Sequence, residues 1–251
     1  MTRLPIGGAV IRRETVTSTM DEALVLAEQG ASEGTIIVAD YQTAGRGRAG
    51  RPWAVNAGDG LLLSVIIRPE VAPDRLSRLP LLVSVAVAEA LEETAPVSCQ
   101  LKWPNDVWIE GKKVAGILIS VHHDADQTPI VIVGIGININ APPDSLPEGA
   151  TSLAAVTARD YDRDNLLEVL TRRLEAAYQQ FAKHDGVADL GDWRRRAALV
   201  GERVRIVQGH ETLIGVYRGI DEGGALLLET PGGGVRRIVS GDLVRGPVSV
   251  S

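Results

Sequence analysis

The segment Gln42-Thr-Ala-Gly-Arg-Gly-Arg-Ala-Gly-Arg-Pro-Trp53 decides between two fold classes for this chain. Three glycines alternate in it with three arginines, Arg46, Arg48 and Arg51. Glycine lets a backbone take positive φ and approach a ligand closely, and a guanidinium group offers planar donors that match carboxylate and phosphate oxygens. A segment of this composition does not belong in a folded core. We therefore interpret it as a loop that is loose when empty and ordered around an anion.

The same segment fits the dinucleotide-binding pattern. Residues 45–50 have GxGxxG spacing, a strand-like run at 35–40 precedes them, and Glu70 lies about twenty residues further on, as the fingerprint requires. However, the fingerprint needs a helix to begin at the glycines, so that its N-terminus binds the pyrophosphate. The chain continues instead with a turn-rich stretch at 52–60 and a second strand-like run at 61–67. The sequence therefore excludes the doubly wound dinucleotide-binding fold.

The composition limits the class of protein. The 251 residues, 45% of them hydrophobic, suffice for one large domain or for a medium and a small one. A net charge of −6 argues against broad nucleic-acid binding, so a basic site must be local. The single cysteine, Cys99, favours a reducing, cytoplasmic location. The adjacent His122–His123 pair does not favour zinc, and no apolar run reaches the roughly 18–20 residues that a membrane span needs.

Apolar periodicity and turn residues predict an α/β domain over residues 1–198. The expected strands are 10–16, 35–41, 61–67, 98–102, 106–109, 113–121 and 130–138. The expected helices are 18–30, 76–93, a short one at Leu153, 165–184 and 188–197, with a loop at 141–150. The first helix is expected to open with a capping box, Thr19-x-x-Glu22, and to stop at Gly30.

The composition changes at about Leu199. Short strand-like runs then alternate with glycine-rich turns, at 203–207, 213–217, 225–228 and 235–239. About five short strands in some fifty residues are typical of a small β-barrel. We therefore expect a second, all-β domain over residues 199–251.

Three further segments carry polar groups beside apolar runs. Lys102-Trp-Pro-Asn-Asp106 combines a cation, an aromatic ring and two polar groups, although Pro-Asn-Asp is also ordinary turn chemistry. Lys112 and Lys113 point to opposite faces of a strand, and Gly116 within it indicates either close approach of a ligand or a bulge. The segment 134–140, Gly-Ile-Gly-Ile-Asn-Ile-Asn, ends a buried strand in two asparagines, which can serve a pocket or cap the strand end.

Together these segments resemble biotin protein ligases (biotin–[acetyl-CoA-carboxylase] ligases) in order and spacing, from about Ser18 to the C-terminus. The resemblance implies an α+β catalytic domain with a mixed or antiparallel sheet flanked by helices, followed by a small SH3-like β-barrel. It implies that biotin reacts with ATP to give biotinyl-5′-AMP, and that a lysine on the biotin carboxyl carrier domain of a biotin-dependent carboxylase then takes the biotinyl group. Biotin and ATP with Mg²⁺ are substrates in this scheme, and no tightly bound prosthetic group is expected.

The resemblance also implies roles for individual residues. Lys113 and Arg48 would be catalytic, with Lys113 holding carboxylate and phosphate oxygens as a point charge. The residues expected to bind biotin are Ser18, Thr19, Gln42, Arg46, Gly47, Arg48, Lys113 and Gly116. Those expected to bind the nucleotide are Arg48, Arg51, Trp53, Asn105 and Asn138. Asp106 is expected near Mg²⁺.

Two features depart from the family pattern. Met20 stands where members usually have the asparagine of Ser-Thr-Asn, so this part of the pocket can contact a ligand only through apolar surface or backbone. The chain also begins at the catalytic domain, without an N-terminal helix-turn-helix, so no DNA binding is expected. The sequence leaves the oligomeric state open, with a homodimer among the arrangements considered.

Two alternative functions compete with this interpretation. A lipoate-type acyl-adenylate ligase would use the same scaffold, but the glycine–arginine loop favours biotin. A nucleic-acid-binding module would place the three arginines of the loop on phosphates and stack Trp53 on a base. The acidic net charge opposes that function, and we interpret the second basic run, Arg194–Arg196, as a solvated helix face.

Overall fold

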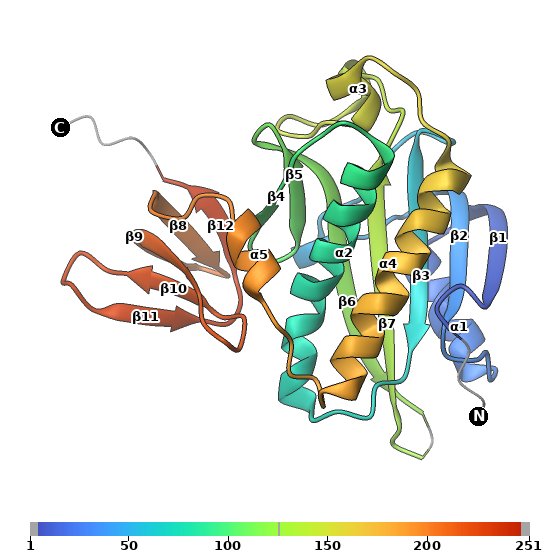
Figure 1. Ribbon diagram of the computed structural model, residues 1–251, viewed down its shortest axis with the longest axis horizontal. Helices are drawn as coiled ribbons and strands as arrows, with labels where there is room; N and C mark the ends of the chain where they lie inside the picture. The colour runs from blue at the N-terminus through green and yellow to red at the C-terminus, as the bar shows by residue number, and fades with distance from the viewer. Residues whose placement is uncertain (1–4, 125, 247–251) are drawn as a thin grey trace.

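The computed structural model describes residues 5–124 and 126–246 and contains two β-sheets, each the centre of one domain (Figure 1). The strands of the first sheet are β1 (Ala9–Val16), β2 (Thr35–Gln42), β3 (Gly60–Ile67), β4 (Cys99–Lys102), β5 (Asp106–Ile109), β6 (Lys112–His123) and β7 (Pro129–Asn138). They lie in the order β1-β2-β3-β7-β6-β5-β4. Only β1 and β2 are parallel, so the sheet is mixed and mostly antiparallel, as the sequence predicted.

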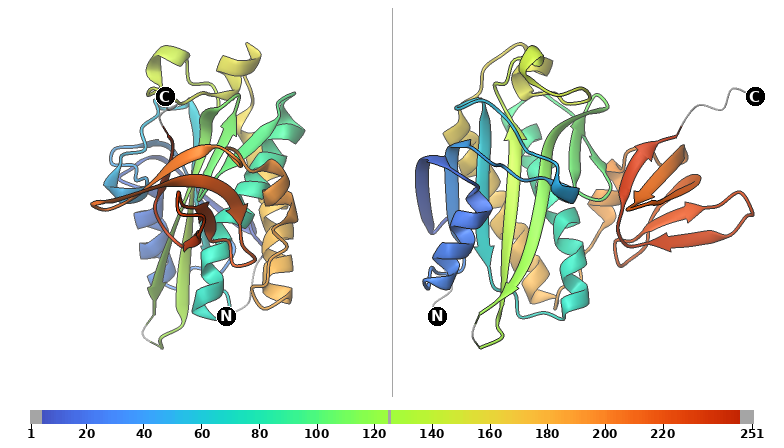
Figure 2. Two further views of the ribbon diagram at one scale, coloured as in Figure 1. Left: turned by 90° about the vertical axis from the view of Figure 1, so that its left-hand side faces the viewer. Right: turned by 180° about the vertical axis from the view of Figure 1, so that it is seen from behind.

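Helices cover both faces of this sheet. They are α1 (Thr19–Glu28), α2 (Leu79–Thr94), α3 (Leu153–Thr157), α4 (Arg163–Lys183) and α5 (Gly191–Arg196). α2 and α4 pack side by side on one face, and α1 lies on the other (Figures 1 and 2). None of the helices in the described part of the chain is long and apolar enough to cross a membrane.

Side chains along β7 alternate between the two faces of the sheet, so each face carries a different set of residues. Val133 and Ile135 join the main core beneath α2 and α4. Ile130 and Ile132, on the opposite face, pack beneath α1. The strand is apolar on both sides because both sides are covered. Beyond α1 the same face continues with Gly134 and Gly136, which have no side chains, so the sheet surface is hollow beside the N-terminus of this helix.

Two helices begin at residues other than those predicted. Ser18 is the N-cap of α1, because its Oγ accepts from the backbone N of Met20 at 3.2 Å. The Thr19–Glu22 capping box is therefore wrong, since the hydroxyl of Thr19 bonds to neighbouring strands instead. The helix predicted at 76–93 begins at Leu79, because Pro73–Arg78 forms a 3₁₀ turn ahead of it.

The second sheet forms the C-terminal domain. Its strands are β8 (Arg203–Gln208), β9 (Glu211–Ile220), β10 (Leu226–Glu229), β11 (Val235–Ile238) and β12 (Asp242–Arg245). They are antiparallel in the order β11-β10-β9-β8-β12, and the sheet is strongly curved (Figure 2). The small all-β domain is thus confirmed, and β12 is a strand to which the sequence assigned no range. The boundary at 198/199 stays a prediction, and the ends of the two proposed domains, 1–4 and 247–251, lie outside the described residues.

The two domains share one buried core. Tyr217 and Leu226 of the second sheet belong to the same apolar cluster as the side chains beneath α2. Polar contacts reinforce this interface, since Trp103 Nε1 donates to the carbonyl oxygen of Gly224 at 3.0 Å. Because the core is continuous, removing the C-terminal domain would expose apolar side chains of the first. Its role is therefore better probed by point substitution.

The basic run on α5 is part of this packing. Arg196 forms an ion pair of 2.6 Å with Glu92 on α2 and is half-buried. Arg194 donates to the carbonyl oxygen of Asp221 in the second domain at 3.1 Å. The interpretation of Arg194–Arg196 as a solvated face is therefore wrong for Arg196, because its charge fixes α5 to α2.

Candidate active site

A cavity of about 400 Å³ lies over the glycines of β6 and β7, beside the N-terminus of α1. It lies within the usual size range of small-molecule pockets, about 300–1,000 Å³. Its walls come from the start of α1, the glycine–arginine loop, the turn between β4 and β5, and strand β12 of the second domain. Every site residue singled out from the sequence lines it, namely Ser18, Thr19, Gln42, Arg46, Gly47, Arg48, Arg51, Trp53, Asn105, Asp106, Lys113, Gly116 and Asn138. The fold thus collects residues spread over 120 positions of the chain; their ligand roles stay predictions.

The indole of Trp53 lies on the glycine floor of this cavity. A Cβ at Gly136 would be 2.4 Å from Cε2 of the indole, and one at Gly116 would be 3.0 Å from its Cζ3. Gly116 is therefore a position of close approach, made here by the Trp53 side chain. The pairing of β5 with β6 also shifts register, since Val107 pairs with Ala115 and Trp108 with Lys113, so the irregularity lies on β6 at Val114. The indole Nε1 is buried and makes no hydrogen bond within the described part of the chain.

Gly136→Ala should lift the Trp53 ring, because overpacking of this kind forces neighbours to shift and typically costs about 1–3 kcal/mol of stability. We expect a lower urea midpoint and an altered near-UV circular dichroism spectrum. Gly232→Ala is a matched control, since a Cβ there meets no atom within 4 Å of the described structure. An unchanged near-UV spectrum in Gly136→Ala would show that the indole does not rest on this glycine in solution.

One side of the cavity, over β2 and β3, holds uncharged polar groups. Gln42 Oε1 accepts from the backbone N of Thr19 at 2.7 Å and from its Oγ1 at 3.1 Å. Ser64 Oγ donates to Thr19 Oγ1 at 2.8 Å. These bonds fix the amide of Gln42, whose Nε2 makes no hydrogen bond to the residues that the structure describes and is available to donate one. This side suits a neutral polar head group.

Met20 closes the cavity next to this polar group. It is buried, and its Sδ lies where a Cβ at Gly134 would be only 2.7 Å away. It also packs with Ile37 and Ile66 beneath α1. Met20 therefore fills the space left by Gly134 and presents only apolar surface to a ligand.

The opposite side, over β4, β5 and β6, carries lysines around one carboxylate. Lys113 Nζ lies 2.6 Å from Asp106 Oδ1, and Lys102 Nζ lies 3.7 Å from Asp106 Oδ2. Burial lowers the pKa of Lys102, and the carboxylate of Asp106 opposes that shift. Lys113 also sits above the Trp53 ring, 5.3 Å from its centroid. In all, five positive and three negative side chains line the cavity, Arg46, Arg48, Arg51, Lys102 and Lys113 against Asp106, Glu148 and Asp242. The excess of cations favours an anionic ligand here.

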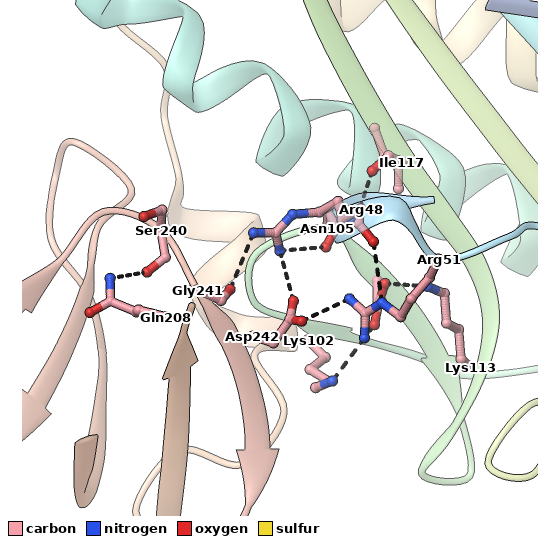
Figure 3. A network of polar contacts seen from close by, with 11 residues as sticks. Arg48, Arg51, Lys102, Asn105, Lys113, Ile117, Gln208, Ser240, Gly241 and Asp242 are labelled. Atoms are coloured by element: carbon pink, nitrogen blue, oxygen red, sulfur yellow. Dashed lines mark hydrogen bonds and ion pairs between the residues drawn. The ribbon is translucent and has the colours of Figure 1, made fainter. Parts of the chain in front are cut away.

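The glycine–arginine loop is fixed by contacts on both sides (Figure 3). Arg48 donates to Asn105 Oδ1 and to the carbonyl oxygen of Gly241, each at 3.2 Å. Burial lowers the pKa of Arg48, while the nearby carboxylates of Asp242 and Asp106 raise it. Arg51 approaches Asp242 at 2.9 Å. By contrast, the half-exposed side chain of Arg46 pairs with Asp21 on α1 at the rim of the cavity, so two of the three arginines face the anion-binding side.

Two amides of the predicted set also hold the backbone in place. Asn105 Nδ2 donates to the carbonyl oxygen of Ile117 at 2.6 Å, which joins the turn after β4 to β6. Asn138 Nδ2 donates to the carbonyl oxygen of Thr151 at 3.0 Å. Both open interpretations of the segment 134–140 therefore hold in part, because Asn138 lines the cavity and also ties down the strand end.

Several cavity residues were not among the predicted site residues, and Lys102, Gly134, Gly136 and Asp242 are the ones that set its charge or its floor. Lys102, Gly134 and Gly136 lie within motifs that the sequence had singled out, so their signal was present. Asp242 had none, because it belongs to a short strand of another domain, more than 190 positions after the loop. No three histidine, cysteine or acidic side chains cluster in the described ranges in a way that could hold a metal.

Comparison with known proteins places this geometry in context. Residues 10–138 match the model of the biotin/lipoate A/B protein ligase family, and residues 199–246 match that of the biotin protein ligase C-terminal domain. The bifunctional ligase/repressor BirA of Bacillus subtilis is 37% identical over 245 residues, which is 96% of this chain and 75% of that protein. The biotin–[acetyl-CoA-carboxylase] ligase of Mycobacterium tuberculosis is 36% identical over 233 residues, 90% of this chain and 85% of the relative. The solved structure of biotin protein ligase from Aquifex aeolicus in complex with biotin and ATP has a TM-score of 0.82 and 34% identity, and the match covers 95% of this chain and 99% of that one.

Proposed function

This chain belongs to the biotin/lipoate A/B protein ligase family, and from that premise we propose that it is a biotin protein ligase. It activates biotin with ATP and transfers the biotinyl group to a lysine of a biotin carboxyl carrier domain. The observation that carries this function is the division of one cavity into a neutral polar side, at Thr19 and Gln42, and a cationic side, at Lys102 and Lys113. Biotin has a neutral ureido head and a carboxylate at the end of its side chain, which matches this division.

In the first step, a carboxylate oxygen of biotin attacks the α-phosphorus of ATP. The bond from that phosphorus to the bridging oxygen breaks, and pyrophosphate leaves. Two anions must approach each other, so fixed cations that face the developing charge lower the barrier. We assign the stabilisation of this developing charge to Lys113 and Arg48. The ammonium group of Lys113 can follow the charge between carboxylate and phosphate oxygens.

In the second step, the unprotonated ε-amine of the carrier lysine attacks the acyl carbon of biotinyl-5′-AMP. An amide bond forms, the bond from the acyl carbon to the phosphate oxygen breaks, AMP leaves and one proton is released. The intermediate would hydrolyse if water reached it first. We therefore assign to Trp53 and the loop around Arg48 and Arg51 the exclusion of water from the acyl phosphate.

Mg²⁺ enters this proposal as part of the ATP substrate. Magnesium usually takes one or two protein carboxylates together with phosphates and water. Asp106 would offer Oδ2, whose contact with Lys102 is long at 3.7 Å, while Oδ1 keeps its ion pair with Lys113. Asn105 and Asn138 are the proposed neighbours of the nucleotide. The carrier domain as acceptor and the absence of DNA binding belong to the same proposal. So does a cytoplasmic location, which the single buried thiol at Cys99 supports.

Isotope exchange between pyrophosphate and ATP tests the assignment directly. We expect exchange that depends on biotin and that neither lipoate nor octanoate supports, followed by labelling of a carrier domain. Exchange with lipoate alone would establish the alternative acyl-adenylate ligase. Salt-sensitive binding of single-stranded DNA without any biotin-dependent exchange would instead favour the nucleic-acid-binding module.

A further inference from the structure

Two arginines of the glycine–arginine loop share one carboxylate that comes from the other domain (Figure 3). Asp242 Oδ1 lies 3.5 Å from Arg48 Nη1, and its Oδ2 lies 2.9 Å from Arg51 Nη2. The carbonyl oxygen of the preceding residue, Gly241, accepts from Arg48 Nη2 at 3.2 Å. The start of β12 thus contacts both guanidinium groups that face the anion-binding side.

Few contacts within the loop hold its arginines over the cavity. Its own hydrogen bonds are short-range, such as the one from the backbone N of Gly47 to the carbonyl oxygen of Arg51. Ala49 has a φ of 53°, in the left-handed region that costs a residue with a side chain about 1 kcal/mol or more. Arg48 and Arg51 also repel each other. A carboxylate between them removes the repulsion and fixes the loop relative to the C-terminal domain.

We propose that Asp242 is a positioning residue for adenylation, which holds Arg48 and Arg51 over the cavity before ATP binds. The inference rests on the proposed function and deepens it, because it gives the C-terminal domain a part in nucleotide binding. Without the carboxylate, the loop spends less time closed. The apparent affinity for ATP then falls in proportion to the closed fraction.

The effect should be selective for one substrate. Asp242 contacts the cationic side of the cavity, over β5 and β6, whereas the Thr19–Gln42–Ser64 network lies over β2 and β3, with β7 between the two sides. Loss of the Asp242 charge therefore changes the site for phosphate and leaves the site for the biotin head group intact. A general loss of folding would affect both.

Asp242→Asn keeps the side-chain size and removes the charge. In the full chain we expect the KM for ATP in biotin-dependent exchange to rise about fivefold, which corresponds to a closed fraction of about one fifth, while the KM for biotin changes less than about twofold. Asp242→Glu, which keeps a carboxylate, should restore most of the ATP affinity. Glu202→Gln is the matched control. Glu202 pairs with Arg245, which lies on β12 together with Asp242, but Glu202 does not touch the loop.

Limited trypsin digestion without any ligand gives a readout that does not depend on activity. Cleavage after Arg46 and Arg48 reports how often the loop opens, whereas Arg51 precedes a proline and resists cleavage. We expect faster loop cleavage in Asp242→Asn than in Glu202→Gln or the unmodified chain. If the unmodified protein shows no biotin-dependent exchange, the proposed function fails, and the digestion still tests the loop contact.

Three results would overturn the inference. Unchanged ATP affinity and unchanged loop cleavage would reduce the contact to an ordinary surface ion pair. An equal rise in both KM values would assign Asp242 a purely structural role. A lower KM for ATP would show that the carboxylate competes with the nucleotide phosphates for the two arginines.

Discussion

Lys113→Ala is expected to slow the formation of biotinyl-5′-AMP by about 10²–10³-fold, the usual cost of removing one fixed donor that faces developing charge. The ammonium group of Lys113 lies between the Asp106 carboxylate and the Trp53 ring, on the cationic side of the cavity. Biotin binding should weaken far less, because in the proposed arrangement the head group contacts the Thr19–Gln42 side. The substitution leaves Asp106 with Lys102 as a partner, so no isolated buried carboxylate is created.

Single-turnover formation of biotinyl-5′-AMP and calorimetric titration with biotin separate the two effects. Lys112→Ala is the matched control, because Lys112 is the exposed neighbour on the same strand, outside the cavity. Its rate should equal that of the unmodified enzyme. Equal losses of rate and biotin affinity in Lys113→Ala would mean that the lysine only maintains the shape of the pocket.

Arg48→Ala is expected to release biotinyl-5′-AMP about 10- to 100-fold faster, because hydrogen bonds to a charged group are worth about 1.5–3 kcal/mol. Arg48 connects the loop to Asn105 on one side and to Gly241 and Asp242 on the other. Truncation removes all these contacts at once. The loop then loses its anchorage to the turn after β4 and keeps only the Arg51–Asp242 ion pair to the C-terminal domain. We therefore expect the intermediate to escape before a carrier lysine reaches it.

The release rate is measured by chasing preformed, radiolabelled biotinyl-5′-AMP with unlabelled intermediate. Escaped intermediate should also label lysines on unrelated proteins in the same mixture. Arg12→Ala, which removes an exposed arginine paired with Asp164 far from the loop, is the control for lost surface charge. An off-rate for Arg48→Ala equal to that of this control would contradict the clamp.

Local features of this chain are predictable from its sequence, whereas features that depend on long-range contacts are not. Strand ranges such as 106–109 and 130–138 were predicted to within one residue, because apolar, β-branched runs and flanking turns are local signals. The N-cap of α1 was misplaced, because Thr19 has the right chemistry for a cap but its hydroxyl is engaged by Gln42 and Ser64, both distant in sequence. Local propensity contains no information about hydrogen bonds to residues that are distant in sequence.

The sequence by itself determined the family, the mixed sheet, the small all-β domain and most of the polar residues that line the cavity, since each motif carries its chemistry within a few positions. Only the tertiary structure decided how these residues pair. It put Lys113 against Asp106, laid Trp53 on Gly136, and brought Asp242 from the end of the chain to the arginines of the glycine–arginine loop. The physical reason is that an ion pair or a ring contact depends on distance in space, which packing of the two sheets sets and which the spacing of residues along the chain does not record.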